Sequence, residues 1–112
     1  MDKLEFEKKF KTAKSELDLK HIDKVLHRSF SPAGDNFEGF MNLVVVNEEF
    51  AECQQQVSKF LRKKSDHMAL LEETADALIG IRYIQKICNI SDEELIKAVN
   101  VKIERQANRV GI

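Results

Sequence analysis

Apolar residues recur along most of the chain at the three- and four-residue spacing of one face of an α-helix. In the N-terminal part this spacing predicts a helical segment over residues 1–31, broken near Ser15. The strongest turn signal of the chain is Ser31-Pro32-Ala33-Gly34. It separates the first segment from a long helix that we expect from about Phe37 to Arg62.

Polar residues mark the ends of two further helices. The run Arg62-Lys63-Lys64-Ser65-Asp66 predicts a turn, and its last two residues are candidate N-caps. The helix that follows should run to about Asn89, a residue type that favours helix C-termini. Ser91 and Glu94 have the spacing of a capping box that opens a last helix. We therefore expect an all-α bundle of four or five helices whose central pair forms an antiparallel hairpin.

The composition agrees with one helical domain. The chain has 112 residues, of which 43% are hydrophobic and 33% charged, and it contains one Pro and four Gly. A chain of this length ordinarily buries roughly two-thirds of its unfolded surface and so builds a core of its own. We expect a single domain over residues 1–112, made of the N-terminal helical segment 1–31 and a motif-bearing core at 37–109.

The charge balance limits the classes of partner. With 18 basic and 19 acidic residues the net charge is −1, which argues against nucleic acid and anionic membranes as partners. The longest purely apolar run, residues 43–46, is too short to span a bilayer, and the charged N-terminus does not resemble a signal peptide. Cys53 and Cys88 form no CxxC motif, and we interpret them as reduced core residues of a cytoplasmic protein.

Two acidic pairs at i, i+3 spacing stand among apolar residues: Glu49 with Glu52, and Glu73 with Asp76. Such pairs are common in a chain with 19 acidic residues, and a solvated helix face explains any single pair. On a helical wheel, however, Glu73 and Asp76 fall inside the apolar stripe of their helix, and Glu49 lies close to the stripe of the preceding one. Glu52 lies further towards the polar side. Carboxylates that face a core are costly unless a positive charge compensates them.

The sequence register brings the two pairs together. Glu49 and Asp76, and likewise Glu52 and Glu73, are equidistant from a midpoint at residues 62–63, inside the predicted turn. In an antiparallel hairpin, each acid would therefore lie level with an acid of the other helix. At about 5 Å and an effective dielectric constant near 20, each close like-charged pair costs on the order of 3 kcal/mol. A divalent cation would offset this repulsion, and oxygen-only ligands favour Mg²⁺ or Mn²⁺ over zinc.

The acidic motifs resemble those of a known family. Glu48-Glu49-Phe50-Ala51-Glu52 and Glu73-Thr74-Ala75-Asp76 are similar to the E-E-x-x-E and E-x-x-D motifs of the MazG-like all-α nucleoside triphosphate pyrophosphohydrolases. Asn100-Val101-Lys102 matches an N-x-K element on the last helix of that family. The family has an Arg four residues after this Lys, where this chain has Gln106, and Arg105 or Arg109 is the candidate substitute.

The resemblance implies Mg²⁺-dependent hydrolysis of a nucleoside triphosphate to the monophosphate and pyrophosphate, in the sanitation of the nucleotide pool. It implies a set of metal ligands, namely Glu49, Glu52, Glu73 and Asp76. Glu48 would then orient or deprotonate the attacking water, although a solvated surface Glu fits this position nearly as well. The candidate substrate-binding residues are Asn100, Lys102, Arg105 and Tyr83. Ordinary surface charge is the alternative for Lys102 and Arg105, and a core tyrosine is the alternative for Tyr83.

Two other functions stay open. One is a dUTPase-like or phosphoribosyl-ATP pyrophosphohydrolase variant, with the same metal ligands and a different pocket. The other is a non-catalytic helical interaction module whose acids lie on a wet face. The sequence does not identify the base or sugar of a nucleotide substrate. Because the N-terminal segment has an apolar face of its own, we also expect a homodimer or a higher homo-oligomer.

Overall fold

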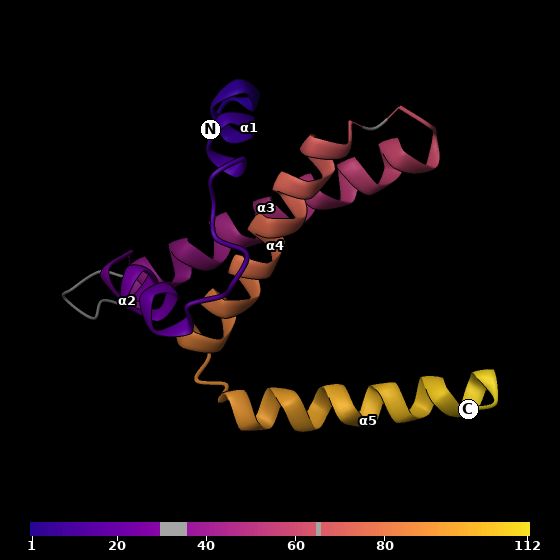
Figure 1. Ribbon diagram of the computed structural model, residues 1–112. Coiled ribbons are helices and arrows are strands. Elements are labelled where there is room, and N and C mark those ends of the chain that lie inside the picture. The colour runs from indigo at the N-terminus through magenta and orange to yellow at the C-terminus, as the bar shows by residue number, and fades with distance from the viewer. Residues whose placement is uncertain (30–35, 65) are drawn as a thin grey trace.

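The computed structural model describes residues 1–29, 36–64 and 66–112, and the side chains of all of these except residues 36–41. The described residues form only helices, which confirms the all-α prediction (Figure 1). The helices are α1 (Lys3–Phe10), α2 (Leu19–Ser29), α3 (Asn36–Leu61), α4 (His67–Ile87) and α5 (Asp92–Val110). The break predicted near Ser15 is the non-helical stretch between α1 and α2. The loop predicted at residues 31–34 lies outside the described residues.

Local capping signals explain where α4 and α5 begin and end. The side chain of Asp66 accepts a hydrogen bond of 3.0 Å from the backbone N–H of Met68, which makes it the N-cap of α4. Ser91 caps α5 in the same way by accepting a bond of 3.1 Å from the N–H of Glu94. Asn89 has a left-handed backbone with φ of 56°, a conformation that stops α4 and that Asn tolerates well.

The helices α3 and α4 pack against each other and are joined by a short connection (Figure 1). Val46 of α3 and Gly80 of α4 are buried in this pair. A Cβ added to Gly80 would come within 3.2 Å of Phe50 Cε1 and 3.2 Å of Val46 Cγ1, so glycine permits the close approach of the two helices. The short α1 contacts α4, and Lys3 forms an ion pair with Asp66.

A polar network joins α2, α4 and the first turn of α5. Arg82 of α4 donates two hydrogen bonds of 2.8 Å to the carboxylate of Asp23 on α2, and it also donates to Asp92 on α5. Gln85, which is buried, donates a bond of 2.9 Å to Asp92. The bonds from Arg82 hold the pKa of both Asp23 and Asp92 below its usual range. The network therefore fixes α5 to α4 at one end only.

Beyond its first turn, α5 projects away from the other helices (Figure 1). Among the described residues only two large apolar side chains are buried, Leu26 and Val46, and each is still 4% exposed. The accessible surface is 9289 Å², whereas a compact monomer of this mass exposes about 6,300 Å². The expectation that one chain completes an ordinary core is therefore wrong, because α5 leaves its apolar stripe uncovered.

The cysteines depart from the core positions expected of them. Both are free thiols, but Cys53 is only half-buried and Cys88 is exposed just after α4. Neither of them therefore fills a core. None of the helices in the described part of the chain combines the length and hydropathy needed to cross a membrane.

Candidate metal centre

Three carboxylates converge between α3 and α4. One oxygen from each of Glu49, Glu52 and Glu73 can be chosen so that all three lie within 4.8 Å of one another. Glu49 and Glu52 are one turn apart on α3 and therefore share a face, while Glu73 reaches them from α4. Oxygen ligands bind Mg²⁺ at about 2.1 Å and Ca²⁺ at 2.3–2.6 Å. Oxygens this close to each other can therefore share one ion after small side-chain adjustments.

The cluster contains a buried oxygen without a partner. Glu49 and Glu73 are half-buried, while Glu52 is exposed, as its position on the helical wheel predicted. Glu73 Oε2 is buried and, within the described residues, has no hydrogen-bond partner. Such an atom is uncommon in a native fold, because a desolvated carboxylate oxygen loses its bonds to water and gains nothing in return. A cation is one way to satisfy it.

Asp76 is the fourth acid of the site. It lies one turn after Glu73 on α4, and its carboxyl group is within hydrogen-bonding reach of Glu49. The carboxyl groups of Glu52 and Glu73 meet in the same way. Two ionised carboxylates offer no proton to each other, so each contact is favourable only if one partner is protonated or a cation lies between them. Asp76 is outside the closest group of three oxygens, although it lines the same cavity as Glu49 and its charge helps to raise the pKa of Glu73.

Burial and mutual repulsion disturb the protonation of the cluster. Burial, followed by the negative charges of Glu52, Asp76 and Glu49, raises the pKa of Glu73 to about 7. Burial, followed by the charges of Asp76 and Glu52, also raises the pKa of Glu49. Without a cation, Glu73 therefore holds a proton for much of the time at neutral pH. A divalent cation would replace this proton, since metal ligands must be deprotonated.

A small cavity adjoins the carboxylates. It has a volume of about 210 Å³ and is lined by residues of α3 and α4: Asn42, Val45, Val46, Glu49, Asp76, Ile79, Gly80 and Tyr83. Tyr83 therefore lines the same cavity as Asp76, on the helix face that the wheel predicted. Asn42 was missed by sequence reasoning, although it stands seven residues before Glu49 and so on the same helix face. The cavity offers an apolar wall and two neutral polar side chains next to the acids.

Glu48 lies outside the cluster. Its side chain is exposed on α3, and its charge contributes to the raised pKa of Glu49. It is thus close enough to influence the site electrostatically while keeping contact with water. Its predicted role as a base stays a prediction.

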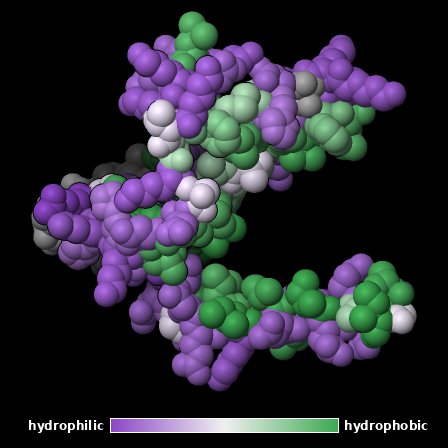
Figure 2. Space-filling model, viewed as in Figure 1, coloured by the Kyte–Doolittle hydropathy of each residue, from purple (hydrophilic) through white to green (hydrophobic). Residues whose placement is uncertain are grey.

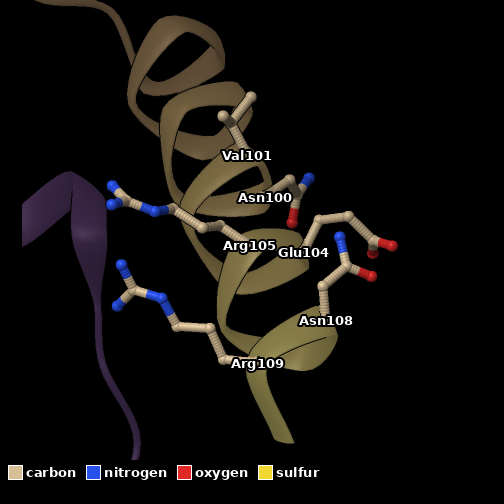
Figure 3. A pocket seen from close by; sticks show the side chains of 6 residues that line it. All are labelled: Asn100, Val101, Glu104, Arg105, Asn108 and Arg109. Carbon is tan, nitrogen blue, oxygen red and sulfur yellow. The ribbon is translucent and has the colours of Figure 1, made fainter. Parts of the chain in front are cut away.

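Within one chain, the structure does not bring Asn100, Lys102 and Arg105 to the carboxylates. All three are exposed on the projecting part of α5 (Figure 1). Asn100 and Arg105 border a hollow of about 790 Å³ whose walls all come from α5 (Figure 3). Arg105 and Arg109 extend to one side of this helix, and Glu104 and Asn108 to the other (Figure 3). A hollow on one helix cannot enclose a ligand, so the smaller cavity beside the acids is the better candidate site.

Comparisons of the chain with protein-family models, with curated proteins and with solved structures gave no match. The resemblance of the acidic motifs to the MazG-like family therefore stays a prediction from the sequence. The case for a function comes from the carboxylate cluster itself.

Proposed function

We propose that this chain is a nucleoside triphosphate pyrophosphohydrolase of the MazG-like type. An antiparallel α3–α4 hairpin would hold Mg²⁺, or Mn²⁺, through Glu49, Glu52, Glu73 and Asp76. The observation that carries the proposal is the convergence of three carboxylates, one of which, Glu73, has a buried Oε2 that no described residue hydrogen-bonds.

The electrostatics of the cluster favour a hard divalent cation. Every candidate ligand is a carboxylate oxygen, and neither His nor Cys belongs to the close group. Carboxylate ligands suit Mg²⁺ and Mn²⁺, whereas structural zinc sites draw on Cys and His. Burial, followed by mutual repulsion, raises the pKa of Glu49 and Glu73, and a cation would offset both effects.

A polyphosphate substrate follows from the charge of the site. An anionic ligand can approach four carboxylates only through a bound cation. Bound Mg²⁺ would neutralise phosphate charge and acidify a water for attack on phosphorus. In this proposal Glu48, which is exposed next to Glu49, would accept the proton of the attacking water, and Asn42 and Tyr83 of the adjoining cavity would contact the nucleoside.

The positively charged side chains of α5 are the proposed contacts for the phosphate groups. Lys102 and Arg105 would contact phosphate oxygens by charge-assisted hydrogen bonds, and Asn100 would add an amide. These contacts require an α5 to lie beside the cluster, which the arrangement within one chain does not provide. Removal of aberrant nucleotides from the cellular pool is the role we propose for the reaction.

The experiment is an assay of product release over a panel of canonical and modified nucleoside triphosphates in the presence of Mg²⁺. We expect one or more substrates to give the monophosphate and pyrophosphate. Glu49→Gln should lower kcat/KM at least 100-fold, because it removes a charge from the metal ligands. The matched control is Glu104→Gln, which makes the same chemical change on the exposed face of α5 and should keep full activity. Release of orthophosphate, or equal activity of the two variants, would contradict the proposal.

A non-catalytic interaction module is the second candidate, and the exposed apolar face of α5 favours it. In that case the acids would form a wet surface, and the protein would hydrolyse none of the triphosphates. The two candidates also differ in their response to Mg²⁺, because only the enzyme requires the cation.

A further inference from the structure

The cavity beside the carboxylates changes in character along its length. Glu49 and Asp76 line its acidic part, and Asn42 and Tyr83 line it seven residues further along α3 and α4. Seven residues are two helical turns, or about 11 Å. In the proposed antiparallel hairpin, Asn42 and Tyr83 are also equidistant from the midpoint at residues 62–63, and so they lie level with each other. The cavity therefore joins an acidic end to a neutral polar end.

Apolar side chains form the middle of the cavity. Val46 is buried there, whereas Val45 is 50% exposed and Ile79 43% exposed. Gly80 also lines the cavity and leaves room in it, because it has no side chain. Figure 2 shows apolar side chains on the surface of the α3–α4 pair that borders the concave side of the molecule. A flat ring that covered Val45 and Ile79 would remove apolar surface from water.

The volume of the cavity limits what can enter it. At about 210 Å³ it is smaller than the roughly 300–1,000 Å³ of pockets that enclose a whole drug-sized ligand. A nucleoside triphosphate therefore places only a part of itself inside. If its phosphates lie on a cation at the acidic end, the base is the part that reaches the neutral end. The single ring of a pyrimidine fits this space better than the two fused rings of a purine.

Asn42 has the hydrogen-bonding groups that the edge of a pyrimidine requires. Its half-buried side-chain amide carries both a donor and an acceptor. Cytosine and uracil each present a donor next to an acceptor on the edge away from the sugar, in opposite order. An amide can turn over to match either order, so Asn42 can hydrogen-bond both bases.

We propose that this cavity binds the base of a pyrimidine nucleoside triphosphate, with Asn42 hydrogen-bonding the edge of the base and Val45 and Ile79 excluding the second ring of a purine. The inference rests on the proposed function, because it places the phosphates on a cation at the acidic end. A purine would have to displace the apolar walls or leave Asn42 without a partner, and rejection of this kind contributes to specificity as much as attraction does.

The test is calorimetric titration of the full chain, in Mg²⁺, with the α,β-imido analogues of dCTP, dUTP, dATP and dGTP, which the proposed reaction does not cleave. Because the phosphate and sugar groups are the same in all four, a difference in affinity reports on the base. We expect the two pyrimidine analogues to bind roughly tenfold more tightly than the purine analogues, or more. Asn42→Ala should weaken pyrimidine binding about tenfold, because it removes the hydrogen bonds to the base.

Asn47→Ala is the matched control for this variant. It makes the same chemical change at an exposed side chain of the same helix, outside the cavity, and should keep the affinities of the wild type. Val45→Ala tests the apolar wall. Alanine favours the helix at this half-exposed position, so α3 stays folded, and the wider cavity should improve purine binding relative to pyrimidine binding by roughly threefold or more.

The outcomes separate this inference from the proposed function. Equal affinities for the pyrimidine and purine analogues in the wild type would overturn the inference alone, and so would equal effects of Asn42→Ala and Asn47→Ala. An unchanged preference in Val45→Ala would overturn the role of the apolar wall. Failure of all four analogues to bind in Mg²⁺ would overturn the proposed function together with the inference.

Discussion

The α3–α4 pair and α5 differ from an ordinary folded monomer in opposite ways. The first packs acidic groups between helices, and the second exposes apolar groups to water. Between α3 and α4, the structure places carboxylates and one partnerless oxygen where packing normally brings apolar groups together. Along α5, it leaves Val99 and Ile103 in water, where polar groups normally stand. Each departure points to a partner of matching chemistry, a cation for the first region and a protein surface for the second. We therefore propose a partner for each region, and the two proposals are independent of each other.

The polar network around Arg82 links α4 to the first turn of α5, and its loss should have the largest effect on stability. Arg82 is only 15% exposed and lies between the carboxylates of Asp23 and Asp92. Arg82→Met should lower the free energy of unfolding by about 3 kcal/mol, because it removes both ion pairs of Arg82 and leaves Asp23 with the longer contact to Lys86. Denaturant unfolding at one fixed protein concentration measures the change.

The control and a second readout sharpen the comparison. Lys97→Met removes a cation from an exposed ion pair with Glu93 and should cost less than about 0.5 kcal/mol. If the regions are independent, Arg82→Met should still respond to Mg²⁺, because the carboxylate cluster belongs to α3 and α4 alone. Loss of the Mg²⁺ response would mean that the network around Arg82 also helps to position the carboxylates of the proposed metal site.

The pH dependence of the metal-free protein gives the next effect. The pKa of Glu73 is raised in the folded state from 4.5 to about 7, so folding favours the protonated form. This contribution is fully present below pH 4.5 and is lost as the pH rises towards 7 and above. Because solvent partly screens the site, we expect stability to fall by on the order of 2 kcal/mol across this range.

Glu73→Gln identifies the source of that slope. The amide does not titrate, so the variant should lose most of the fall in stability when both proteins are unfolded in chelator at several pH values. Saturating Mg²⁺ should also reverse the slope in the wild type, because the cation replaces the proton. An unchanged slope in Glu73→Gln would place the titrating group elsewhere.

Gly80→Ala tests the close approach of α3 and α4 and has the smallest expected effect. The new Cβ would lie 3.2 Å from Val46 Cγ1, a buried side chain, so the two helices must separate slightly. The strain exceeds the gain in helix propensity, and the net loss of stability should be about 1 kcal/mol. In proportion, the affinity for Mg²⁺ should fall more than the free energy of unfolding, because the ligands of the cation come from both helices. Denaturant unfolding of the variant and the wild type measures the loss of stability, and calorimetric titration with Mg²⁺ measures the change in affinity.

The sequence predicted the fold well where local chemistry decides it. Asp66 and Ser91 cap their helices as their residue types predicted, and Asn89 adopts a left-handed backbone after α4. The course of α5 after its capped start could not be predicted. An apolar stripe such as that of Val99 and Ile103 shows that a helix face is to be covered, but not by which chain.

The candidate site was predictable in its members and not in its details. The helical wheel identified Glu49, Glu73 and Asp76 as acids on packed faces, because helical spacing fixes the direction of each side chain. Spacing does not fix rotamers, so the closest group of three oxygens, without Asp76, needed coordinates. The partnerless oxygen of Glu73 is also invisible in the sequence, since burial depends on both helices at once.

The most direct test of the metal site is the melting temperature of the protein with and without millimolar Mg²⁺, at one protein concentration. A ligand at 100 times its dissociation constant stabilises a fold by about 2.7 kcal/mol, which corresponds to a rise of about 10 °C in the melting temperature of a chain of this length. We predict this rise for the wild type and for Glu104→Gln, and its loss in Glu73→Gln. A wild-type melting curve that is indifferent to Mg²⁺ would contradict a cation site between α3 and α4.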